Sequence, residues 1–330
     1  MREQDIRDRE AHSRYLEMVR KDAEALAVER SRFILIDCPA CGGCQHEFAF
    51  EKVGFTYATC ADCETLFVNP RPAYELLAPL YTDSEAAQFW IHEFFAPKAQ
   101  VRREKIFRPR AADVAARFPQ LGRGARVGDI GAGFGLFLQE LRRQWPAAEL
   151  VAIEPSDEMA DMCREKGLVV VNAMLEDMKE EQGGFLLLTA FEIFEHIYDP
   201  ASFLRRVREL LAPGGRLYLT TLNGQGFDIQ VFWARSKAVF PPHHLNFANP
   251  RSVRILLERC GFEVDEVSTP GVLDWDIVES AFVHEDSNPG RFFCTVAAHA
   301  TQEAKRALQE WVRTFGFSSH MRVIAHREET

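Results

Sequence analysis

The 330-residue sequence lacks the features that would place a protein in a membrane or a secretory pathway. It has no run of about eighteen consecutive apolar residues, the length that a helix needs to cross a bilayer. Its first ten residues, MREQDIRDRE, contain no apolar segment like the centre of a signal peptide. We therefore expect a cytoplasmic protein that does not span a membrane.

Positive charge is also scarce, because 39 Lys and Arg stand against 49 Asp and Glu, a formal net charge of −10. Nucleic-acid binding needs clustered Lys and Arg that neutralise phosphates, so the charge argues against RNA or DNA as the partner. One local basic cluster is typical of a solvated helix face, with contact to a substrate phosphate or carboxylate as the alternative. Its members are Lys98, Arg102, Arg103, Lys105, Arg108 and Arg110.

Structural disulfides are not expected in a reducing compartment, so the eight cysteines call for another explanation. Four of them form the pattern C-x2-C-x18-C-x2-C, namely Cys38, Cys41, Cys60 and Cys63. Two such pairs at this separation are typical of a zinc ribbon whose closed four-thiolate site is structural. Cys44 or His46 lies close enough in sequence to replace one ligand, and four buried thiols without a metal are the alternative.

Glycine and proline are absent from residues 3–32, where apolar residues recur at helical spacing. This pattern predicts one amphipathic helix that packs on the body of the protein or on a second subunit, so a homodimer stays open. The patterns along the rest of the sequence divide the whole chain into six parts. We expect a helix over 1–36, a zinc ribbon over 37–72, a helical linker or lid over 73–118, an α/β domain over 119–270, a helical cap insertion over 271–319 and a final strand over 320–330.

From Ala125 onward, short apolar runs alternate with helical stretches. This alternation predicts βαβ units and a parallel sheet covered on both faces, an α/β fold. Ligands of such sheets bind beyond the carboxyl ends of the strands. We therefore expect segments 191–198 and 222–249 to line a ligand pocket.

A glycine-rich turn joins the first apolar run to a helix. Asp129 ends the run, and Gly131, Gly133 and Gly135 follow it. Glycines there let the backbone approach a ligand, and the next helix offers free N–H groups. The third glycine comes two residues after the second, not three as in the dinucleotide fingerprint, so the spacing does not favour NAD. Glu154 ends the second run, where a carboxylate can accept both hydroxyls of a ribose.

Together these segments resemble the class I S-adenosylmethionine-dependent methyltransferases. The resemblance rests on VGDIGAGFG at 127–135, VAIEPS at 151–156, TAFEIFEHIYDP at 189–200 and LLAPGGRLYLTT at 210–221, and it covers roughly residues 105–270. It implies a Rossmann-like sheet, mostly parallel with an antiparallel last strand, and S-adenosyl-L-methionine as the cofactor.

The resemblance also implies roles for individual residues. In that family the glycine turn holds the methionine part of the cofactor, the acidic residue after the second strand holds the ribose, and residues after the third strand flank the adenine. Many members have an acidic residue where this chain reads NAML. Carried over by position, the cofactor residues are Asp129, Gly131, Gly133, Glu154, Met174 and Leu175, with Phe191 packing beside the cofactor.

The N-terminal portion resembles a zinc-ribbon-bearing subgroup of these enzymes through CPACGG and CADCETLFVNPRP. Members of that subgroup often act on sugars, glycans or other small metabolites. The resemblance implies a small-molecule or sugar-type acceptor. It implies no particular substrate.

Methyl transfer from a sulfonium aligns donor and acceptor, and a hydroxyl acceptor must also lose a proton. His243 and His244 follow a rigid Pro-Pro step on an expected pocket segment, and we expect His244 to be the general base, with His243 next. Glu192 and Glu195 are competing bases, and a structural hydrogen-bonding role is the alternative for each. We expect O-methylation; the alternatives are C- or N-methylation of a small metabolite, an RNA methyltransferase and a non-catalytic scaffold.

Overall fold

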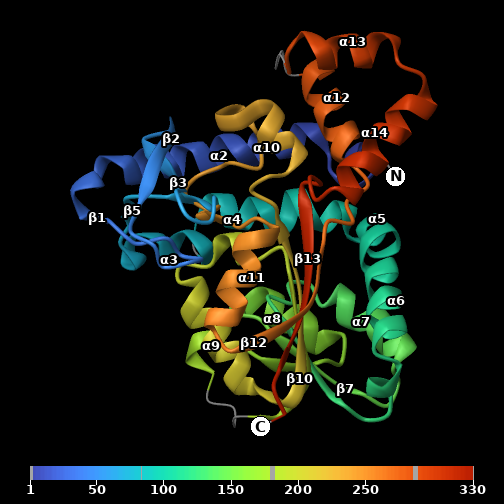
Figure 1. Cartoon of the computed structure of the whole chain (residues 1–330). Helices are drawn as coiled ribbons and strands as arrows, with labels where there is room; N and C mark the ends of the chain where they lie inside the picture. Colours follow the sequence, from blue (N-terminus) through green and yellow to red (C-terminus); the bar gives the residue numbers. More distant parts are fainter. Residues whose placement is uncertain (1–2, 83, 179–182, 285–288, 330) are drawn as a thin grey trace.

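A seven-stranded sheet forms the centre of the computed structural model, which describes residues 3–82, 84–178, 183–284 and 289–329 (Figure 1). The strand order is β12-β13-β10-β9-β6-β7-β8. Strands β8, β7, β6, β9 and β10 are parallel, whereas β13 runs antiparallel to both of its neighbours. This confirms the predicted Rossmann-like sheet. The bounds are β6 Arg126–Ile130, β7 Glu149–Ile153, β8 Val169–Val171, β9 Phe185–Phe191, β10 Leu211–Leu222, β12 Phe262–Ser268 and β13 His320–Arg327.

Helices cover both faces of this sheet, with α9 and α11 on one side and α6 and α7 on the other (Figure 1). One buried apolar cluster contains Leu204 of α9 and Leu256 of α11, and a second contains Val114 of α6 and Leu141 of α7. Burying these apolar side chains is the main force that holds the layers together. The bounds are α6 Arg108–Arg117, α7 Leu136–Gln144, α8 Asp157–Glu165, α9 Pro200–Leu210 and α11 Pro250–Arg259.

The N-terminal segment differs from the single predicted helix. It forms α1 (Glu3–Ile6) and α2 (Arg9–Val28), followed by the short turn η1 (Arg30–Arg32). The break lies at Asp8, whose carboxylate accepts a hydrogen bond from the N–H of Ala11 at 3.0 Å and so caps α2. Val19, Ala23 and Leu26 are buried, so α2 packs on the body of the protein.

The zinc-ribbon region shares a sheet with the α/β part of the chain. Its four-stranded sheet has the order β11-β4-β3-β2, and β11 (Asn246–Phe247) comes from the segment after β10. Cys38, Cys63 and Phe67 also belong to the same buried cluster as Leu256 of α11. The two regions therefore form one packed body. The other bounds are β1 Phe33–Ile34, β2 His46–Lys52, β3 Phe55–Cys60, β4 Leu66–Val68 and β5 Arg71–Pro72.

Residues 73–118 are almost continuously helical. The elements are α3 Tyr74–Thr82, α4 Glu85–Phe89, the π-helical turn η2 Trp90–Phe95, η3 Ala96–Lys98, α5 Ala99–Arg102 and the π-helical turn η4 Arg103–Phe107, which leads into α6. None of the helices in the described ranges is both long enough and apolar enough to cross a membrane.

A helical cap stands beyond the carboxyl ends of the parallel strands (Figure 1). The insertion between β12 and β13 forms α12 (Asp274–His284), α13 (Arg291–His299) and α14 (Gln302–Thr314), next to α10 (Phe227–Phe232). The buried Asp274 ties the two ends of the insertion together, because its carboxylate accepts hydrogen bonds from the Ser318 hydroxyl and the Ser319 N–H. The predicted cap insertion is confirmed.

Candidate active site and metal centre

A cavity of about 790 Å³ lies where the parallel strands end. Gly131 after β6, Glu154 after β7 and Glu192 after β9 all line it. Residues from the predicted segments 191–198 and 222–249 line it as well, including His196 and His244. This volume falls within the usual range for small-molecule sites, and the position agrees with the rule for open α/β sheets.

The glycine turn lets the backbone form one wall of the cavity. Gly131 has φ 68°, and a Cβ atom there would lie 2.8 Å from Cγ2 of Ile193, so a larger residue would be strained and crowded. Gly133 has φ 53°, and the nearest atom to a Cβ there would be Sδ of Met159 at 4.0 Å. Both glycines line the cavity. The turn therefore presents bare backbone to a ligand beside the first turn of α7.

Glu154 connects the second strand to the glycine turn. One carboxylate oxygen accepts a hydrogen bond from the N–H of Gly133 at 2.7 Å, and the other accepts from the N–H of Ser156 at 2.9 Å. Burial raises the pKa of Glu154, and these two N–H groups oppose the shift. Because a carboxylate has about four lone-pair sites, it can still accept hydroxyl donors from a ribose.

Residues that follow the third strand line the cavity next to Glu154. Met174 is 37% exposed and Leu175 is buried at the start of the short turn η6 (Leu175–Asp177). The acidic residues Glu176 and Asp177 come directly afterwards and also line the cavity. They supply the negative charge that the NAML segment itself lacks, and sequence reasoning missed them by two positions.

Two of the predicted cofactor residues, Asp129 and Phe191, lie behind the cavity wall. The Thr189 hydroxyl donates a hydrogen bond to the Asp129 carboxylate at 2.6 Å, and burial raises the pKa of Asp129 to about 7. The Phe191 ring packs edge-on against Phe137 with ring centroids 4.6 Å apart. Neither side chain is among the described residues that line the cavity. Both side chains support the wall from behind.

Glu192 occupies the rim of the cavity in an unusual backbone conformation, with φ 55°. Its carboxylate accepts a hydrogen bond from the Thr220 hydroxyl at 2.7 Å and lies 3.3 Å from both Arg110 and His320. Burial raises the pKa of Glu192, but His320, Arg110 and Thr220 outweigh burial and hold the pKa below its usual range. The carboxylate is thus ionised and held in place, features common at functional sites.

Three histidines, His196, His243 and His244, line one part of the cavity. The ring centroids of His196 and His244 lie 4.6 Å apart, and those of His196 and His243 lie 6.3 Å apart. Nδ1 of His244 is 2.6 Å from the carbonyl oxygen of Ala238, so Nδ1 carries the proton and Nε2 carries the lone pair. Burial lowers the pKa of His244 well below its usual value, and that of His196 to about 4. These imidazoles are neutral and, unaided, are weak bases near neutral pH.

Glu195 belongs to the same group of side chains. It is buried on the short turn η7 (Phe194–His196), and the Thr221 hydroxyl donates to its carboxyl group at 2.8 Å. Burial, together with the nearby Glu192, raises the pKa of Glu195 to about 8. Glu195, His196 and His244 each offer one ligand atom, and these atoms all lie within 4.8 Å of one another.

The N-terminal helices line the cavity together with the predicted cap, and sequence reasoning missed the contribution of the N-terminal helices. Arg7 and the α2 residues His12 and Tyr15 line it, and Tyr15 stacks on Phe94 with centroids 5.9 Å apart. Asp228 of α10 also lines the cavity, and its Oδ1 is buried without a hydrogen-bond partner among the described residues.

The basic cluster of the linker is divided between structural and cavity positions. Arg103 and Arg108 pair with the buried Glu140, and Lys105 pairs with Asp5. Arg102 lines the cavity, and burial lowers its pKa to about 9. Three of the six residues therefore form structural ion pairs, whereas Arg102 lies at the cavity and Arg110 pairs with Glu192 at its rim.

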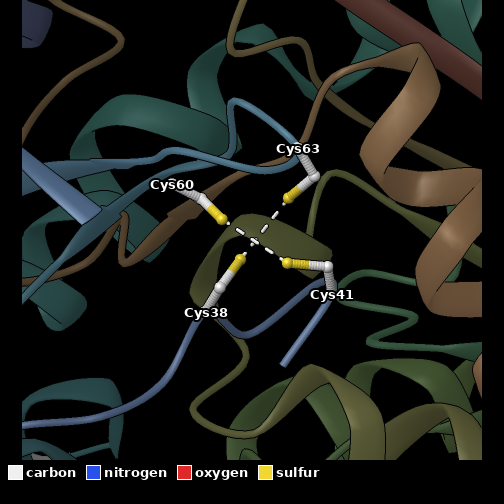
Figure 2. A group of neighbouring side chains, drawn as sticks. All are labelled: Cys38, Cys41, Cys60 and Cys63. Carbon is white, nitrogen blue, oxygen red and sulfur yellow. Dashed lines mark hydrogen bonds between the residues drawn. The ribbon is translucent and has the colours of Figure 1, made fainter. Parts of the chain in front are cut away.

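The four predicted zinc ligands meet at one point between the ribbon and the α/β core. Figure 2 shows the sulfur atoms of Cys38, Cys41, Cys60 and Cys63 pointing toward one another from two separate segments. The Cys38–Cys63 and Cys41–Cys60 sulfur distances are 3.5 and 3.4 Å, and all four sulfurs lie within 4.8 Å of one another. A tetrahedral zinc with bonds of about 2.3 Å needs sulfurs about 3.8 Å apart, so the geometry fits.

Neither alternative ligand joins this group of described residues. Cys44 is exposed, and Nε2 of His46 lies 3.1 Å from Nδ2 of Asn69. The four thiols of the two C-x2-C pairs are therefore the set that a metal would contact.

Comparisons with known proteins agree with this geometry. The family described as "Methyltransferase domain" matches residues 102–267. A ubiquinone biosynthesis O-methyltransferase of Xanthomonas euvesicatoria is 34% identical over 158 residues, which cover 44% of this chain and 65% of that protein. The protein of the same name from Xylella fastidiosa is 28% identical over 211 residues, 59% of this chain and 85% of its own length.

A solved structure has a similar arrangement at low identity. The S-adenosylmethionine-dependent methyltransferase from Mesorhizobium loti is 18% identical with a TM-score of 0.46, covering 68% of this chain and all (100%) of that chain. The sheet order and the glycine turn followed by Glu154 define the fold of class I S-adenosylmethionine-dependent methyltransferases. The chain belongs to the methyltransferase-domain family. It spans 65% of the length of the Xanthomonas relatives.

Proposed function

We propose that this protein transfers a methyl group from S-adenosyl-L-methionine to a hydroxyl oxygen of a small-molecule acceptor. One observation carries the proposal: the same cavity contains the glycine turn, Glu154 and the histidine group. Donor and acceptor can therefore meet in one enclosed space. The O-methyltransferase names of the sequence relatives support oxygen as the acceptor atom. A sugar-type acceptor is the narrower form, suggested by the ribbon.

Donor binding is assigned to the end of the cavity near the first three strands. Gly131 and Gly133 would face the methionine part, Glu154 would accept the ribose hydroxyls, and Met174 with Leu175 would flank the adenine. When bound, the cofactor supplies an electrophilic methyl group on a sulfonium. Asp129 and Phe191 would act from behind the wall by holding the turn and the end of β9 in place.

Acceptor binding is assigned to the end near η7 and the segment before β11. The chain's own task there is to align the acceptor oxygen with the methyl group and to remove the hydroxyl proton. We assign proton removal to the histidine group, with His244 as the residue on which it depends most and with His243 and Glu192 next. Nε2 of His244 is the polar atom held for this purpose by the Nδ1 contact to Ala238.

The Cys38, Cys41, Cys60 and Cys63 group is proposed to bind one structural zinc ion. Its four thiolates would complete a tetrahedral site and leave no open position for a substrate. The cytoplasmic location stays a prediction from the sequence, and no oligomeric state is proposed.

The test uses purified protein, methyl-labelled cofactor and fractionated small metabolites, with labelled products identified by mass spectrometry. Once an acceptor is found, His244→Ala should lower turnover by about 10²- to 10⁴-fold. Its affinity for S-adenosylhomocysteine should not change, because the donor end of the cavity is untouched. His299→Ala, an exposed position on α13, is the matched control. Turnover of His244→Ala within a fewfold of wild type would contradict the role of His244, and the absence of any labelled product would favour the scaffold alternative.

A further inference from the structure

We propose that Glu195, His196 and His244 form a binding site for a divalent cation at the acceptor end of the cavity. Their three ligand atoms lie within 4.8 Å of one another, and all three residues line the cavity. Two imidazoles and one carboxylate on one side of an ion, with open positions on the other, are a typical donor set for Fe²⁺, Mn²⁺, Co²⁺ or Zn²⁺.

The fold holds the two segments that supply these ligands in register. Glu195 and His196 are neighbours on η7, after β9, whereas His244 lies before β11. The N–H of Leu245 donates a hydrogen bond to the carbonyl oxygen of Glu195 at 2.8 Å and ties one segment to the other. The ligand group is therefore built by backbone contacts and does not depend on mobile side chains meeting by chance.

Outer contacts orient two of the three ligands. Nδ1–H of His244 donates to the Ala238 carbonyl oxygen at 2.6 Å, which leaves Nε2 as the donor atom for a metal. The Thr221 hydroxyl donates to one carboxyl oxygen of Glu195 at 2.8 Å, and the backbone N–H groups of Glu195 and Leu222 also hydrogen-bond this carboxylate. Because a carboxylate has about four lone-pair sites, it can still bind a cation. Hydrogen bonds of this kind are what fixes the tautomer and orientation of metal-ligating histidines and carboxylates.

This site differs in kind from the four-cysteine group. Four thiolates close a tetrahedral site, whereas three protein ligands leave positions that face the cavity. Adjacent open positions on one ion favour an acceptor with two neighbouring oxygen atoms, such as a catechol, a vicinal diol or a 2-hydroxy acid. The acceptor class thus becomes a small molecule that chelates through oxygen.

The chemical step rests on the proposed function. A cation that binds the acceptor hydroxyl lowers the pKa of that hydroxyl, and the proton leaves to water. An oxygen lone pair then forms the C–O bond to the methyl group as the C–S bond breaks, and the electron pair of that bond stays on sulfur. The products are a methyl ether, S-adenosylhomocysteine and one released proton. In this form of the proposed function Nε2 of His244 binds the cation, so the ligand role replaces the general-base role assigned to His244 above.

The experiment measures cation binding directly, on the 330-residue protein loaded beforehand with one equivalent of Zn²⁺ for the proposed four-cysteine site. Mn²⁺ titration followed by water-proton relaxation should show one Mn²⁺ per chain. Glu195→Gln and His244→Gln should each weaken Mn²⁺ binding by at least about 100-fold, beyond the 10- to 100-fold typical of losing only an outer contact. His12→Gln, which changes another histidine in the same cavity, should bind Mn²⁺ as the wild type does. Affinity for S-adenosylhomocysteine checks that each variant is folded.

A second measurement uses only the wild type, so it tests the cation site even if the variants fail to fold. Co²⁺ at this site should give weak visible bands without the strong near-ultraviolet thiolate band that Co²⁺ gives in a four-cysteine site. No Mn²⁺ or Co²⁺ binding at millimolar concentration, or unchanged binding in His244→Gln, would overturn the cation site. Full turnover in a chelator that leaves the four-cysteine zinc in place would also overturn it while methyl transfer stands. Cation binding without methyl transfer to any hydroxyl would support the site and refute the proposed function.

Discussion

At the scale of single residues, Glu154 combines two tasks. Its carboxylate holds the N–H groups of Gly133 and Ser156 and also lines the cavity. Glu154→Ala should weaken binding of S-adenosylhomocysteine by about 1.5 to 3 kcal/mol, the usual worth of hydrogen bonds to a charged group. Isothermal titration calorimetry gives the affinity, and Asp157→Ala, an exposed carboxylate in the same segment, is the control. Wild-type affinity in Glu154→Ala would mean that the ribose lies elsewhere.

Asp129 should give the cofactor-free protein a distinctive pH dependence. Burial raises its pKa from 3.8 in a model peptide to about 7 in the folded chain. Between those pH values the folded protein keeps a proton that the unfolded chain has released, so the free energy of unfolding falls as the pH rises. Asp129→Asn keeps an oxygen that can accept from Thr189 and should make this fall shallower, by a few kcal/mol at most across the window.

The measurement for Asp129 is denaturant unfolding at several pH values between 4 and 8, in wild type and variant. The two proteins should differ most at the alkaline end, where wild-type Asp129 is ionised in an apolar environment. Parallel stability curves would show that Asp129 has an ordinary pKa in the folded chain. Glu195 contributes a slope of the same sign in both proteins and therefore cancels in the comparison.

At the scale of elements, the zinc-ribbon sheet shapes the acceptor end of the cavity. Strand β11 pairs with β4 directly after His243 and His244. The buried Tyr57 of β3 donates its hydroxyl to the carbonyl oxygen of His244 at 3.2 Å, and the side chain of Asn249 donates to the carbonyl oxygen of Cys63 at 2.8 Å. A metal in the four-cysteine group would therefore stabilise the position of His244 through the sheet.

Tyr57→Phe tests this connection because it removes one hydroxyl. The free energy of unfolding should fall by about 0.5 to 1.5 kcal/mol, and turnover should fall several-fold as the His244 segment loosens. Tyr218→Phe is a matched control, since it removes the buried hydroxyl that donates to Asp113 at 2.8 Å, next to α6. It should lose similar stability, measured by thermal unfolding, and keep its turnover. Equal turnover in the two variants would show that the Tyr57 hydroxyl of the ribbon sheet does not help to position the acceptor.

At the scale of the whole molecule, two segments distant in sequence close the cavity together. The N–H of Glu3 donates to the Asp276 carboxylate of α12 at 2.6 Å, and Arg9 donates to the Ser280 hydroxyl at 3.2 Å. Glu3, Arg7 and the α12 residues Ile277 and Ala281 line the cavity. The N-terminal helices and the cap therefore form one cover over the cavity.

Asp276→Ala should loosen this cover without changing the donor end. The KM for the acceptor should rise about 2- to 10-fold, consistent with losing about one hydrogen bond, and affinity for S-adenosylhomocysteine should stay the same. Steady-state kinetics with the identified acceptor measures the effect, and Asp265→Ala on β12 is a control outside the cover. An unchanged KM would show that α1 and α12 contribute nothing to acceptor binding.

The sequence by itself determined the features that depend on residues close together along the chain. Alternating apolar runs identified the strands, because side-chain period and length decide strand or helix locally. The two C-x2-C pairs named the four cysteines that converge in Figure 2, and the glycine spacing located the turn beside Glu154. The break at Asp8 followed a local capping signal as well, although a single long helix was predicted.

The tertiary structure alone decided which side chains face the cavity. Asp129 and Phe191 follow the sequence motif, yet packing turned them behind the wall, since alternate residues of a strand point to opposite faces. Strand β11 joined the ribbon sheet, and Glu195, His196 and His244 met, only because segments far apart in the sequence pack against each other. No local period encodes such a meeting, because it depends on the free energy of burying the whole core and not on any neighbouring residue.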